Sequence, residues 1–518
     1  MEKIILKNVI KCYGDRKIID IEELKIYQGE KIGIVGINGS GKSTLLNIIS
    51  GKIELDGGEV IVNGNISYIE QLNNEESFLS GGEITKKKID DKLSEHSDIL
   101  LADEPSSNLD IDEIEKLKRK LKEYKGTLCL ISHDRNLLDS VVDNILEIEG
   151  GQVTKYRGNY TKYKTQKEES RKRKQFEYEQ YVTEKKRLEV SINKVKNEAK
   201  SMRKTPKRMG NSEARLHKRG VENKREKVEQ RSKSLKTRLE KLEEKEKPSM
   251  EYNIFMKMPE SLRVKSKYIV SADNLTLKVG NKMLLDNTKF NIKTNSKTAL
   301  IGKNGVGKTT LIKEILNSNF NIKISPSSKI AYFKQDLNNL DENETIIENI
   351  LRDTNQDETT IRNILASLNI KGNDVYKKVE VLSGGERVKV SLTKIMTSNS
   401  NFLILDEPTN FLDIESIEAL EYLMKEFKGT ILFVTHDRNL IDNVATNIMI
   451  IDNKEITEFE GNYTKYIEYK ENKKKKVDNN NLLLEFKLAE ITSKLSICKD
   501  EKEKQKLEEE YMKLMKNR

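Results

Sequence analysis

One ordered series of short motifs occurs twice in this 518-residue chain. The glycine-rich segment Gly36–Ser43 recurs as Gly302–Thr309, and the motif Leu79–Glu83 recurs as Leu382–Glu386. The motifs Asp-Glu-Pro, His-Asp-Arg-Asn-Leu and Gly-Asn-Tyr-Thr-Lys-Tyr also occur once in each copy. Self-similarity on this scale indicates two copies of one domain in tandem. This repeat limits the possible folds more than any other feature of the chain.

The distance between equivalent residues changes sharply at one point in the repeat. Lys42 and Lys308 lie 266 positions apart, and Gln71 and Gln335 lie 264 positions apart. From the Leu-Ser-Gly-Gly-Glu motif onward, every equivalent pair lies 303 positions apart. The first copy therefore lacks 39 residues between its glutamine and this motif.

Composition excludes several classes of protein. The cysteines Cys12, Cys129 and Cys498 offer no even disulfide framework and no zinc-site spacing, which favours a reducing cytosol. No apolar run reaches the roughly 18 to 20 residues of a membrane span, and the N-terminal residues lack the apolar region of a signal peptide. We therefore expect a cytoplasmic protein that neither spans nor crosses a membrane.

The segment between the two copies has a helical pattern and a concentrated positive charge. Its apolar residues step by three and four and then by seven, which predicts two antiparallel helices that share one seam. The seam residues are Leu188, Ile192, Val195, Ala199, Met202, Val221, Val228, Leu235 and Leu242. Pro206 and Gly210 mark the expected turn, because proline lacks an N–H and glycine permits a reversal.

Charge divides the chain unevenly. Residues 161–248 contain 30 basic and 15 acidic residues and therefore have a net charge of +15, whereas the whole chain has +10. The rest of the chain is consequently acidic, with a net charge of −5. On charge alone, the hairpin is either a solvated coiled coil or a surface that binds nucleic acid phosphates.

A second helical pattern follows the second copy. Leu484, Leu488, Ile491 and Leu495 step by four, three and four, and the pattern resumes at Leu507 after a charged break. This periodicity predicts a short C-terminal helical hairpin.

Both glycine-rich segments match the phosphate-binding motif GxxxxGK[ST]. Apolar residues precede and follow each segment, which gives the strand, loop and helix that the motif requires. The glycines let backbone N–H groups turn toward phosphates, and Lys42 or Lys308 reaches the β- and γ-phosphates. The hydroxyl of Ser43 or Thr309 then holds Mg²⁺. Each copy is therefore expected to bind a magnesium nucleotide.

Polar groups with catalytic potential follow two apolar strands of each copy. One strand ends in the adjacent carboxylates Asp103–Glu104 or Asp406–Glu407. The aspartate can hold the water shell of the metal, and the glutamate can polarise an attacking water. Another strand ends at a histidine whose neutral imidazole can contact a γ-phosphate or a water. The expected catalytic residues are Glu104, Glu407, His133 and His436.

Together these motifs resemble the ATP-binding cassette (ABC) superfamily, because the Leu-Ser-Gly-Gly-Glu signature lies between a glutamine loop and the Asp-Glu strand. Two cassettes on one chain with a charged helical linker and no membrane domain look like the ABC-F family, whose members are soluble ATPases that bind the ribosome. The resemblance implies an α/β fold with two tandem P-loop ABC nucleotide-binding domains, a long antiparallel α-helical hairpin linker and a C-terminal helical extension. The expected segments are 1–162 for the short first domain, 163–248 for the linker, 249–466 for the second domain and 467–518 for the extension.

In this family the cassettes pair head to tail. The resemblance therefore implies one ATP between the Lys42 loop and the Ser383 signature, and another between the Lys308 loop and the Ser80 signature. The residues implied to bind ATP are Tyr13, Gly36, Asn38, Gly39, Ser40, Gly41, Lys42, Ser43, Thr44, Gln71, Ser80, Gly81, Gly82 and Glu83 in the first copy, and Gly302, Asn304, Gly305, Val306, Gly307, Lys308, Thr309, Thr310, Gln335, Ser383, Gly384, Gly385 and Glu386 in the second. The residues implied to hold Mg²⁺ are Ser43, Gln71, Asp103, Thr309, Gln335 and Asp406.

The chain departs from the family pattern at two places. An aromatic residue that stacks on adenine is expected before each glycine loop; Tyr13 fits, but the aligned residue of the second copy is Val279. The second site is therefore expected to bind adenine less well. The histidine of the family's Asp-Glu-Pro-Thr-Asn-His-Leu-Asp motif is replaced by Asn108 or Phe411, which puts communication between the two sites through this loop in doubt.

The tip of the linker, residues 204–217, is similar to linkers of the antibiotic-resistance branch that protects against lincosamides, pleuromutilins and streptogramin A. Members of that branch enter the ribosomal E site, displace the P-site tRNA with the linker and point it toward the peptidyl transferase centre. The implied partner is the 70S ribosome, including 23S rRNA and P-site tRNA, with no membrane partner and with the chain acting as a monomer whose cassettes pair intramolecularly. The residues implied to contact RNA are Arg203, Lys204, Pro206, Lys207, Arg208, Met209, Arg215, Lys218 and Arg219.

Three other functions remain open at this point. The chain could be an ABC-F translation factor that acts on stalled ribosomes without a drug role, although the arm insertion of such factors belongs where the 39 residues are absent. It could be the ATPase component of a transporter, but transporters dock through the helical part of the cassette, which the first copy nearly lacks. It could also be a DNA-associated ATPase whose hairpin holds a duplex.

Overall fold

The structure is a computed structural model that places most of the chain. It describes residues 1–70, 81–95, 97–107, 109–201, 211–245, 264–318, 320–334, 339–354, 356–473, 487–488, 491–492 and 512, without the side chains of 81–84, 199–201, 211–223 and 225. The chain divides into two compact units, of which one contains both cassettes and the other is the helical segment Tyr160–Glu251.

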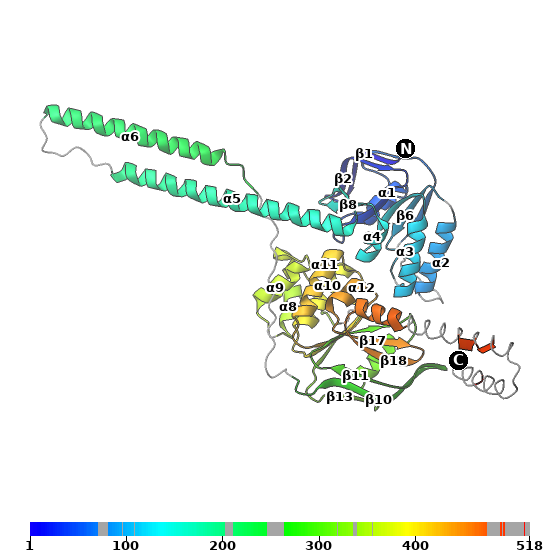
Figure 1. Ribbon diagram of the computed structural model, residues 1–518. Coiled ribbons are helices and arrows are strands. Elements are labelled where there is room, and N and C mark those ends of the chain that lie inside the picture. Colours follow the sequence, from blue (N-terminus) through cyan, green and yellow to red (C-terminus); the bar gives the residue numbers. More distant parts are fainter. Residues whose placement is uncertain are drawn as a thin grey trace. The chain divides into compact units, whose positions relative to one another are not determined.

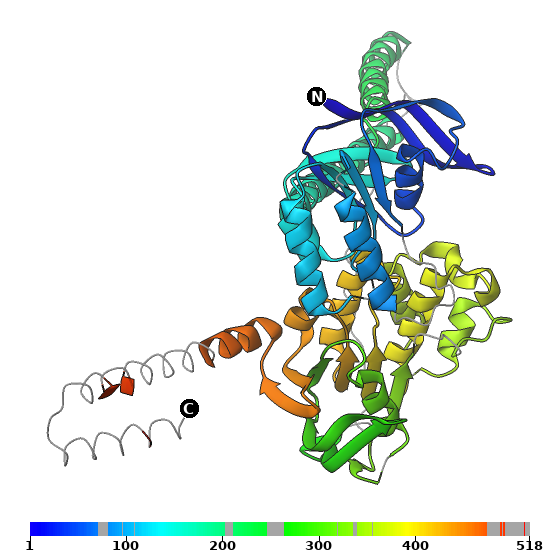
Figure 2. The same cartoon turned by 90° about the vertical axis from the view of Figure 1, so that its right-hand side faces the viewer.

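The first cassette, in residues 1–159, contains a mainly parallel sheet and a smaller antiparallel sheet. Their strand orders are β5-β6-β7-β3-β8-β9 and β2-β1-β4, and only β9 runs antiparallel in the larger sheet. The strands are β1 (Glu2–Tyr13), β2 (Arg16–Tyr27), β3 (Lys31–Val35), β4 (Gly57–Val62), β5 (Ile66–Ile69), β6 (Ile99–Asp103), β7 (Thr127–Ile131), β8 (Asn144–Glu149) and β9 (Gln152–Arg157). The helices are α1 (Lys42–Ile49), α2 (Gly81–Ser94), α3 (Ile111–Glu123) and α4 (Arg135–Val141), and α2 and α3 lie side by side (Figures 1 and 2).

The second cassette repeats this plan. Its sheets have the orders β14-β15-β16-β12-β17-β18 and β11-β10-β13. The strands are β10 (Tyr268–Val279), β11 (Lys282–Lys293), β12 (Lys297–Ile301), β13 (Ile322–Ile324), β14 (Ile330–Phe333), β15 (Phe402–Asp406), β16 (Thr430–Val434), β17 (Asn447–Asp452) and β18 (Glu455–Glu460). The helices are α7 (Lys308–Leu316), α8 (Ile346–Leu351), α9 (Glu358–Ser367), α10 (Gly384–Thr397), α11 (Ile414–Glu426) and α12 (Arg438–Val444), with 3₁₀ turns η2 (Gly372–Tyr376) and η3 (Val379–Val381). The expectation of two tandem ABC-type α/β domains is confirmed.

Burial explains why the central strands are apolar at all but one residue each. All residues of β6, β7, β15 and β16 are buried, as expected for parallel strands covered on both faces. In the second cassette, Leu403, Leu405 and Phe433 pack against α9 to α12, whereas Phe402 and Ile404 pack against β10, β11 and α7. Successive residues of a strand point to opposite faces, so one sheet separates two cores. Figure 1 shows α10 to α12 on one face of the larger sheet and β10, β11 and β13 on the other.

The 39 extra residues of the second copy correspond to a small helical subdomain. It contains α8, α9, η2 and η3, and it has its own core, to which Ile346, Ile350, Ile361 and Leu365 contribute. In the first cassette β5 ends at Ile69 and α2 already begins at Gly81. The chain between them is too short for an equivalent subdomain.

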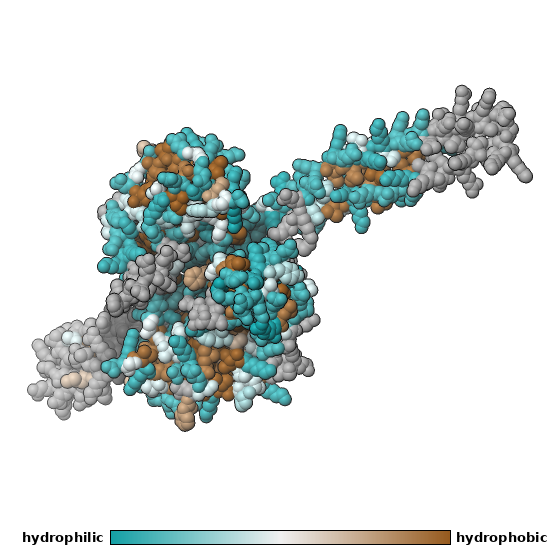
Figure 3. Space-filling view, turned by 180° about the vertical axis from the view of Figure 1, so that it is seen from behind, coloured by the Kyte–Doolittle hydropathy of each residue, from teal (hydrophilic) through white to brown (hydrophobic). Residues whose placement is uncertain are grey.

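The helical segment contains two long helices, α5 (Tyr160–Ser201) and α6 (Asn211–Glu240), which contact each other. Leu188, Ile192 and Val195 of the predicted seam are buried, and a stripe of apolar residues is visible along this segment in Figure 3. Arg238 Nη2 lies 3.3 Å from Glu184 Oε1. This pair joins the late part of α6 to the middle of α5, as antiparallel helices require. Helix α5 begins three residues before the predicted boundary at 163.

Parts of the predicted linker tip and C-terminal extension lie outside the described residues. For the tip, this applies to Arg203, Lys204, Pro206, Lys207, Arg208 and Met209. Arg215, Lys218 and Arg219 lie on α6, but their side chains are not described. In the extension, the structure shows only Leu488 and Ile491 of the predicted apolar series, and both are buried.

A core truncation tests the buried strands. Leu101 on β6 is 0% exposed. We expect Leu101→Ala to lower the free energy of unfolding of the first cassette by about 2 to 5 kcal/mol, because the substitution leaves a cavity. Urea unfolding followed by circular dichroism measures this change.

The matched control is Lys7→Ala on the exposed side of β1. It should change the free energy by less than about 0.5 kcal/mol. Equal effects of the two substitutions would contradict the assigned core.

Candidate functional site

Each glycine-rich loop joins a buried strand to a helix, β3 to α1 and β12 to α7. In the first loop, Gly39 and Gly41 have φ angles of +76° and +102°, which side chains rarely adopt. An added Cβ on Gly41 would also lie 2.8 Å from Cγ2 of Ile18. The second loop repeats this conformation, with φ angles of +73° at Gly305 and +108° at Gly307. The loop therefore requires glycine immediately before the lysine.

The lysine of each motif lies against its own loop. Nζ of Lys42 donates to the carbonyls of Gly36 at 2.8 Å and Ile37 at 3.0 Å, and Lys308 donates to Gly302 at 2.8 Å. Burial lowers the pKa of both lysines, although nearby carboxylates oppose the shift. A cationic side chain thus lies at a helix N-terminus, where anionic phosphate groups bind favourably.

The hydroxyl and carboxylate groups expected to hold Mg²⁺ lie together. The Ser43 hydroxyl lies beside the Asp103 carboxylate and Thr309 lies beside Asp406, and each hydroxyl opposes the rise that burial causes in the pKa of its carboxyl group. These are the hard oxygen ligands that Mg²⁺ prefers. Within the described residues, no cluster of three or more His, Cys, Asp or Glu side chains is suited to a metal ion. A bound Mg²⁺, which neutralises charge on the phosphates, takes water and phosphate oxygens as further ligands beside such hydroxyl and carboxylate groups.

The two candidate catalytic glutamates have the same unusual backbone. Glu104 and Glu407 have φ angles of +49° and +51°. Such a conformation costs a non-glycine residue about 1 to 3 kcal/mol and occurs mainly at functional sites. The N–H of Glu104 donates to the Ile131 carbonyl at 3.0 Å, and that of Glu407 donates to Val434 at 2.9 Å. The neighbouring strand therefore holds each glutamate at the carboxyl end of the sheet.

Each glutamate lies beside a histidine. Nε2 of His133 is 3.3 Å from Oε1 of Glu104, and the same distance separates His436 from Glu407. Burial raises the pKa of Glu104 to about 7, against the effect of Lys42, and it also raises the pKa of Glu407. Burial and the nearby lysines lower the pKa of His133 to about 3 and that of His436 to about 4. Both imidazoles are therefore neutral at pH 7 and can donate one hydrogen bond and accept another.

Each glycine loop contacts the other cassette. The N–H of Asn38 donates to Oδ2 of Asp413 at 3.2 Å, and its side-chain Nδ2 donates to the Phe411 carbonyl at 2.7 Å. In the reciprocal contact, the N–H of Asn304 donates to Oδ2 of Asp110 at 3.4 Å. Asp413 and Asp110 are also the N-caps of α11 and α3. The two cassettes are thus paired head to tail within one chain.

The signature of the second cassette lies beside the first glycine loop. Ser383 caps α10 and forms a capping box with Glu386, whose N–H donates to the Ser383 Oγ at 3.3 Å. An added Cβ on Gly385 would lie 3.4 Å from Nδ2 of Asn38, whereas Gly384 faces open space. The structure thereby brings the Lys42 loop and the Ser383 signature together.

The equivalent signature of the first cassette is only partly described. Gly81, Gly82 and Glu83 form the first turn of α2, without described side chains. Ser80 and both glutamines, Gln71 and Gln335, lie outside the described residues. Their expected roles in ATP and Mg²⁺ binding stay predictions.

A cavity of about 680 Å³ lies beside the second glycine loop. The expected ATP-binding, metal and catalytic residues that line it are Asn304, Gly305, Gly307, Lys308, Thr309, Thr310, Asp406, Glu407 and His436. Val279 also lines it and is 55% exposed, while Tyr13 before the first loop is 53% exposed. Val306 instead packs against the core. The second site therefore presents an accessible aliphatic side chain, whereas the contact of Tyr13 with a base stays a prediction.

The remaining residues of the first loop have different surroundings. Thr44 is half-buried in α1, and Ser40 is buried. The Ser40 Oγ has no hydrogen-bond partner among the described residues. A buried hydroxyl of this kind can accept or donate to a ligand at the loop.

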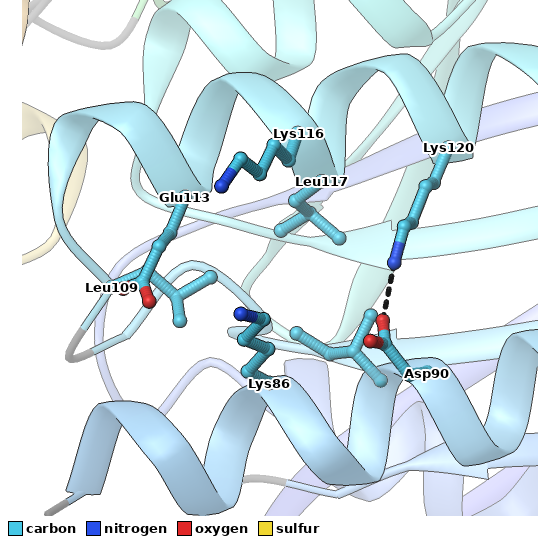
Figure 4. Close-up of a pocket in the computed structure, with 8 residues that line it drawn as sticks. Lys86, Asp90, Leu109, Glu113, Lys116, Leu117 and Lys120 are labelled. Atoms are coloured by element: carbon cyan, nitrogen blue, oxygen red, sulfur yellow. Dashed lines mark hydrogen bonds and ion pairs between the residues drawn. The ribbon is translucent and has the colours of Figure 1, made fainter.

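One pocket of the first cassette is not lined by any candidate ATP-binding, metal or catalytic residue. It is a groove between α2 and α3 lined by Lys86, Ile89, Asp90, Leu109, Glu113, Lys116, Leu117 and Lys120 (Figure 4). Lys120 forms an ion pair with Asp90 across it. None of the glycine-loop residues lines this groove.

Sequence reasoning missed several contacts between the cassettes. Asp110 and Asp413 end the Asp-Glu-Pro segments, and their equal spacing in both copies was the signal that could have identified them. Arg135 and Arg438 belong to the repeated His-Asp-Arg motif, and each forms ion pairs with the other cassette. The sequence alone does not indicate that these two side chains reach the other cassette.

Comparison with known proteins identifies a matching family and several relatives of this chain. The family model described as ABC transporter matches residues 20–75 and 285–410. The erythromycin resistance ATP-binding protein MsrA of Staphylococcus epidermidis is 36% identical over 464 residues, which are 83% of this chain and 94% of that protein. The ribosome protection protein VmlR of Bacillus subtilis (strain 168) is 31% identical over 486 residues, 88% of each chain. The ATP-binding protein Uup of Buchnera aphidicola subsp. Acyrthosiphon pisum (strain APS) is 30% identical over 501 residues, 86% of this chain and 80% of that protein.

Solved structures share the fold. The RNase-L Inhibitor is 20% identical and aligns with a TM-score of 0.57 over 88% of this chain and 91% of its own. At this identity the likeness concerns the fold alone. In the part of the chain that the structure describes, no helix has both the length and the apolar character needed to cross a membrane.

Replacing Gly41 tests the geometry of the first loop. In a Lys308→Ala background that isolates the first site, we expect Gly41→Ala to weaken ATP binding by about tenfold or more, because left-handed backbone costs an alanine roughly 1 to 2 kcal/mol and its Cβ meets Ile18. Titration with a fluorescent ATP analogue measures the affinity.

The matched control is Gly39→Ala. Gly39 also has a positive φ, but an added Cβ would have no neighbour within 4 Å. Its loss of affinity should therefore be smaller, and an equal loss would show that the contact with Ile18 does not matter.

Proposed function

This chain belongs to the ABC-F family of ATP-binding cassette proteins, and on that premise we propose that it is a ribosome-protection factor. It hydrolyses ATP with its two cassettes. In the proposal, it binds the E site of the 70S ribosome and its linker reaches toward the P-site tRNA and the peptidyl transferase centre, so that a bound antibiotic is lost. The observation that supports this proposal most strongly is the likeness to the erythromycin resistance and ribosome protection proteins over nearly the whole chain.

In the proposed chemistry, both sites use the same set of residues. Lys42 and Lys308 hold the β- and γ-phosphates, while Ser43 with Asp103 and Thr309 with Asp406 hold Mg²⁺. Glu104 and Glu407 polarise the attacking water, and the neutral imidazoles of His133 and His436 orient it. The contacts of Asn38 with Asp413 and Phe411 support composite sites that need both cassettes.

The helical hairpin is the proposed ribosome-binding element. Arg173 and Arg187 of α5 have 83% and 79% exposed side chains, so both of these charges face solvent. A net charge of +15 on residues 161–248 can neutralise several phosphates of ribosomal RNA or tRNA. Closing of the cassettes on ATP would set the hairpin angle, and hydrolysis would reopen them.

A second candidate is an ABC-F translation factor that acts on stalled ribosomes without a drug role. The chain is about as similar to the ATP-binding protein Uup, at 30% identity, as to the ribosome protection protein VmlR, at 31%, so the likeness alone does not single out a drug role. A transporter ATPase is the weaker alternative, since the described first cassette has no counterpart of the α8 and α9 subdomain.

Trapping the closed state tests the proposed function. We expect Glu104→Gln with Glu407→Gln to retain ATP binding and lose turnover, because an amide cannot polarise the water. The double variant should sediment with 70S ribosomes in ATP and not in ADP. Full ATPase activity would contradict the roles of the glutamates, and absence from ribosomes in ATP would contradict both translational functions.

Neutralising the tip tests RNA contact. Arg203, Lys204, Lys207 and Arg208 changed to Gln should weaken ribosome binding and reduce its dependence on salt, because fewer counterions are released. The matched control changes Arg171, Lys172, Arg173 and Lys174 to Gln. It removes the same charge from the N-terminal part of α5, away from the tip. Equal affinity of the tip variant and the parent would contradict the proposal.

Drug rescue separates the two candidates. In a translation reaction inhibited by a lincosamide, the active protein should restore synthesis, and the Glu104→Gln, Glu407→Gln variant should not. Ribosome binding without rescue by any of the three drug classes would favour the translation factor.

A further inference from the structure

Two equivalent arginines each form ion pairs with the other cassette. Arg135 and Arg438 lie 303 positions apart, each two residues after the site histidine. They are the first residues of the short helices α4 and α12. Each arginine therefore connects the loop of one candidate site to a helix of the other cassette.

The Arg135 contact is the more buried one. Arg135 is 9% exposed, and its guanidinium pairs with Glu421 on α11. Glu418 lies 3.6 Å away and Asp437 lies 3.8 Å away. Nδ2 of Asn443 donates to the other oxygen of Glu421 at 3.0 Å, which fixes that carboxylate. One guanidinium thus meets three carboxylates of the second cassette.

The Arg438 contact is smaller and more exposed. Nη1 lies 2.6 Å from Oε1 of Glu115, and Nη2 donates to the Ile111 carbonyl at 3.1 Å. The Arg438 side chain is 23% exposed, against 10% for Arg135. At the position equivalent to Glu421, the first cassette has Lys118, which pairs with Glu115 at 3.4 Å. The divergence of one residue therefore makes the two contacts unequal.

Arg135 also connects the two histidine loops. Asp437 directly follows His436 and caps α12 by accepting from the N–H groups of Asn439 and Leu440. Arg135 follows His133 by two residues, so its contact with Asp437 joins the loop of one site to the loop of the other. The contact of Phe411 with Asn38, by comparison, uses a main-chain carbonyl, and the Phe411 side chain is 62% exposed.

We propose that Arg135 is a positioning residue that couples nucleotide binding at the two sites, and that Arg438 contributes less. A buried ion pair resists separation, because removing one partner leaves an uncompensated charge in a poorly solvated place. A shift of the His133 loop on binding is therefore passed to α11 and to the loop of His436. By linkage, the effect on affinity is equal in both directions. The inference rests on the proposed nucleotide sites but not on ribosome binding.

The test measures affinity at the second site with and without the first. The chain contains no tryptophan, so Val279→Trp creates a single fluorescent reporter at the second site. Glu104→Gln and Glu407→Gln prevent turnover, and Lys42→Ala removes binding at the first site. The coupling factor is the ratio of ATP affinities at the second site without and with Lys42→Ala, and we expect about fivefold or more for the parent.

Arginine variants are then compared in this background. Arg135→Met should bring the ratio close to one without changing the affinity measured in the presence of Lys42→Ala. Arg135→Lys should restore part of the coupling, and Glu421→Gln should reduce it without removing the arginine. The matched control Arg438→Met should keep most of the coupling.

Three results would overturn the proposal. They are a parent ratio of one, an unchanged ratio in Arg135→Met, and equal reductions in Arg135→Met and Arg438→Met. Failure of the glutamate pair to abolish turnover would instead contradict the proposed catalytic residues, so the two failures are distinguishable.

Discussion

The pairing of the two cassettes depends on two aspartates that each serve two partners. Asp110 and Asp413 cap α3 and α11, and each also accepts a hydrogen bond from the glycine loop of the other cassette. Because a capping carboxylate is fixed to its helix, the opposite loop is held at a defined distance from that helix. The groups around Lys42 and Lys308 therefore come from both copies of the repeat. A single cassette could not assemble them.

The repeat is symmetric in its sheets, its glycine loops and its Glu–His pairs, but unequal in its helical regions. The second cassette has the α8 and α9 subdomain, and the first has a groove between α2 and α3 instead. Lys389 forms a buried ion pair with Asp413 at 3.1 Å, whereas its equivalent Lys86 lines that groove (Figure 4). Such differences give the two sites unequal surroundings while leaving the phosphate-binding atoms alike. Two sites of this kind can have different affinities and different roles in one cycle.

Much of the architecture follows from local sequence signals. The GxxxxGK[ST] segments predict strand, loop and helix because only glycine tolerates the φ angles that the loop adopts, and apolar runs such as Ile99–Asp103 predict buried parallel strands. The seam of Leu188, Ile192 and Val195 likewise predicts the hairpin. Contacts such as Arg135 with Glu421 could not be predicted in this way. They join residues 286 positions apart, and nothing in the local pattern specifies which carboxylate an arginine meets. The positive φ of Glu104 and Glu407 was equally hidden, because a glutamate is not a residue that favours this conformation.

The central claim is that both cassettes enclose ATP while the hairpin lies on the ribosome. A cryo-electron microscopy structure of the Glu104→Gln, Glu407→Gln variant with ATP and 70S ribosomes tests it most directly. The account predicts two nucleotides, each contacted by both cassettes, with the protein in the E site and residues 202–210 directed toward the peptidyl transferase centre. Nucleotides contacted by one cassette each, or a hairpin that projects away from the ribosome, would contradict it.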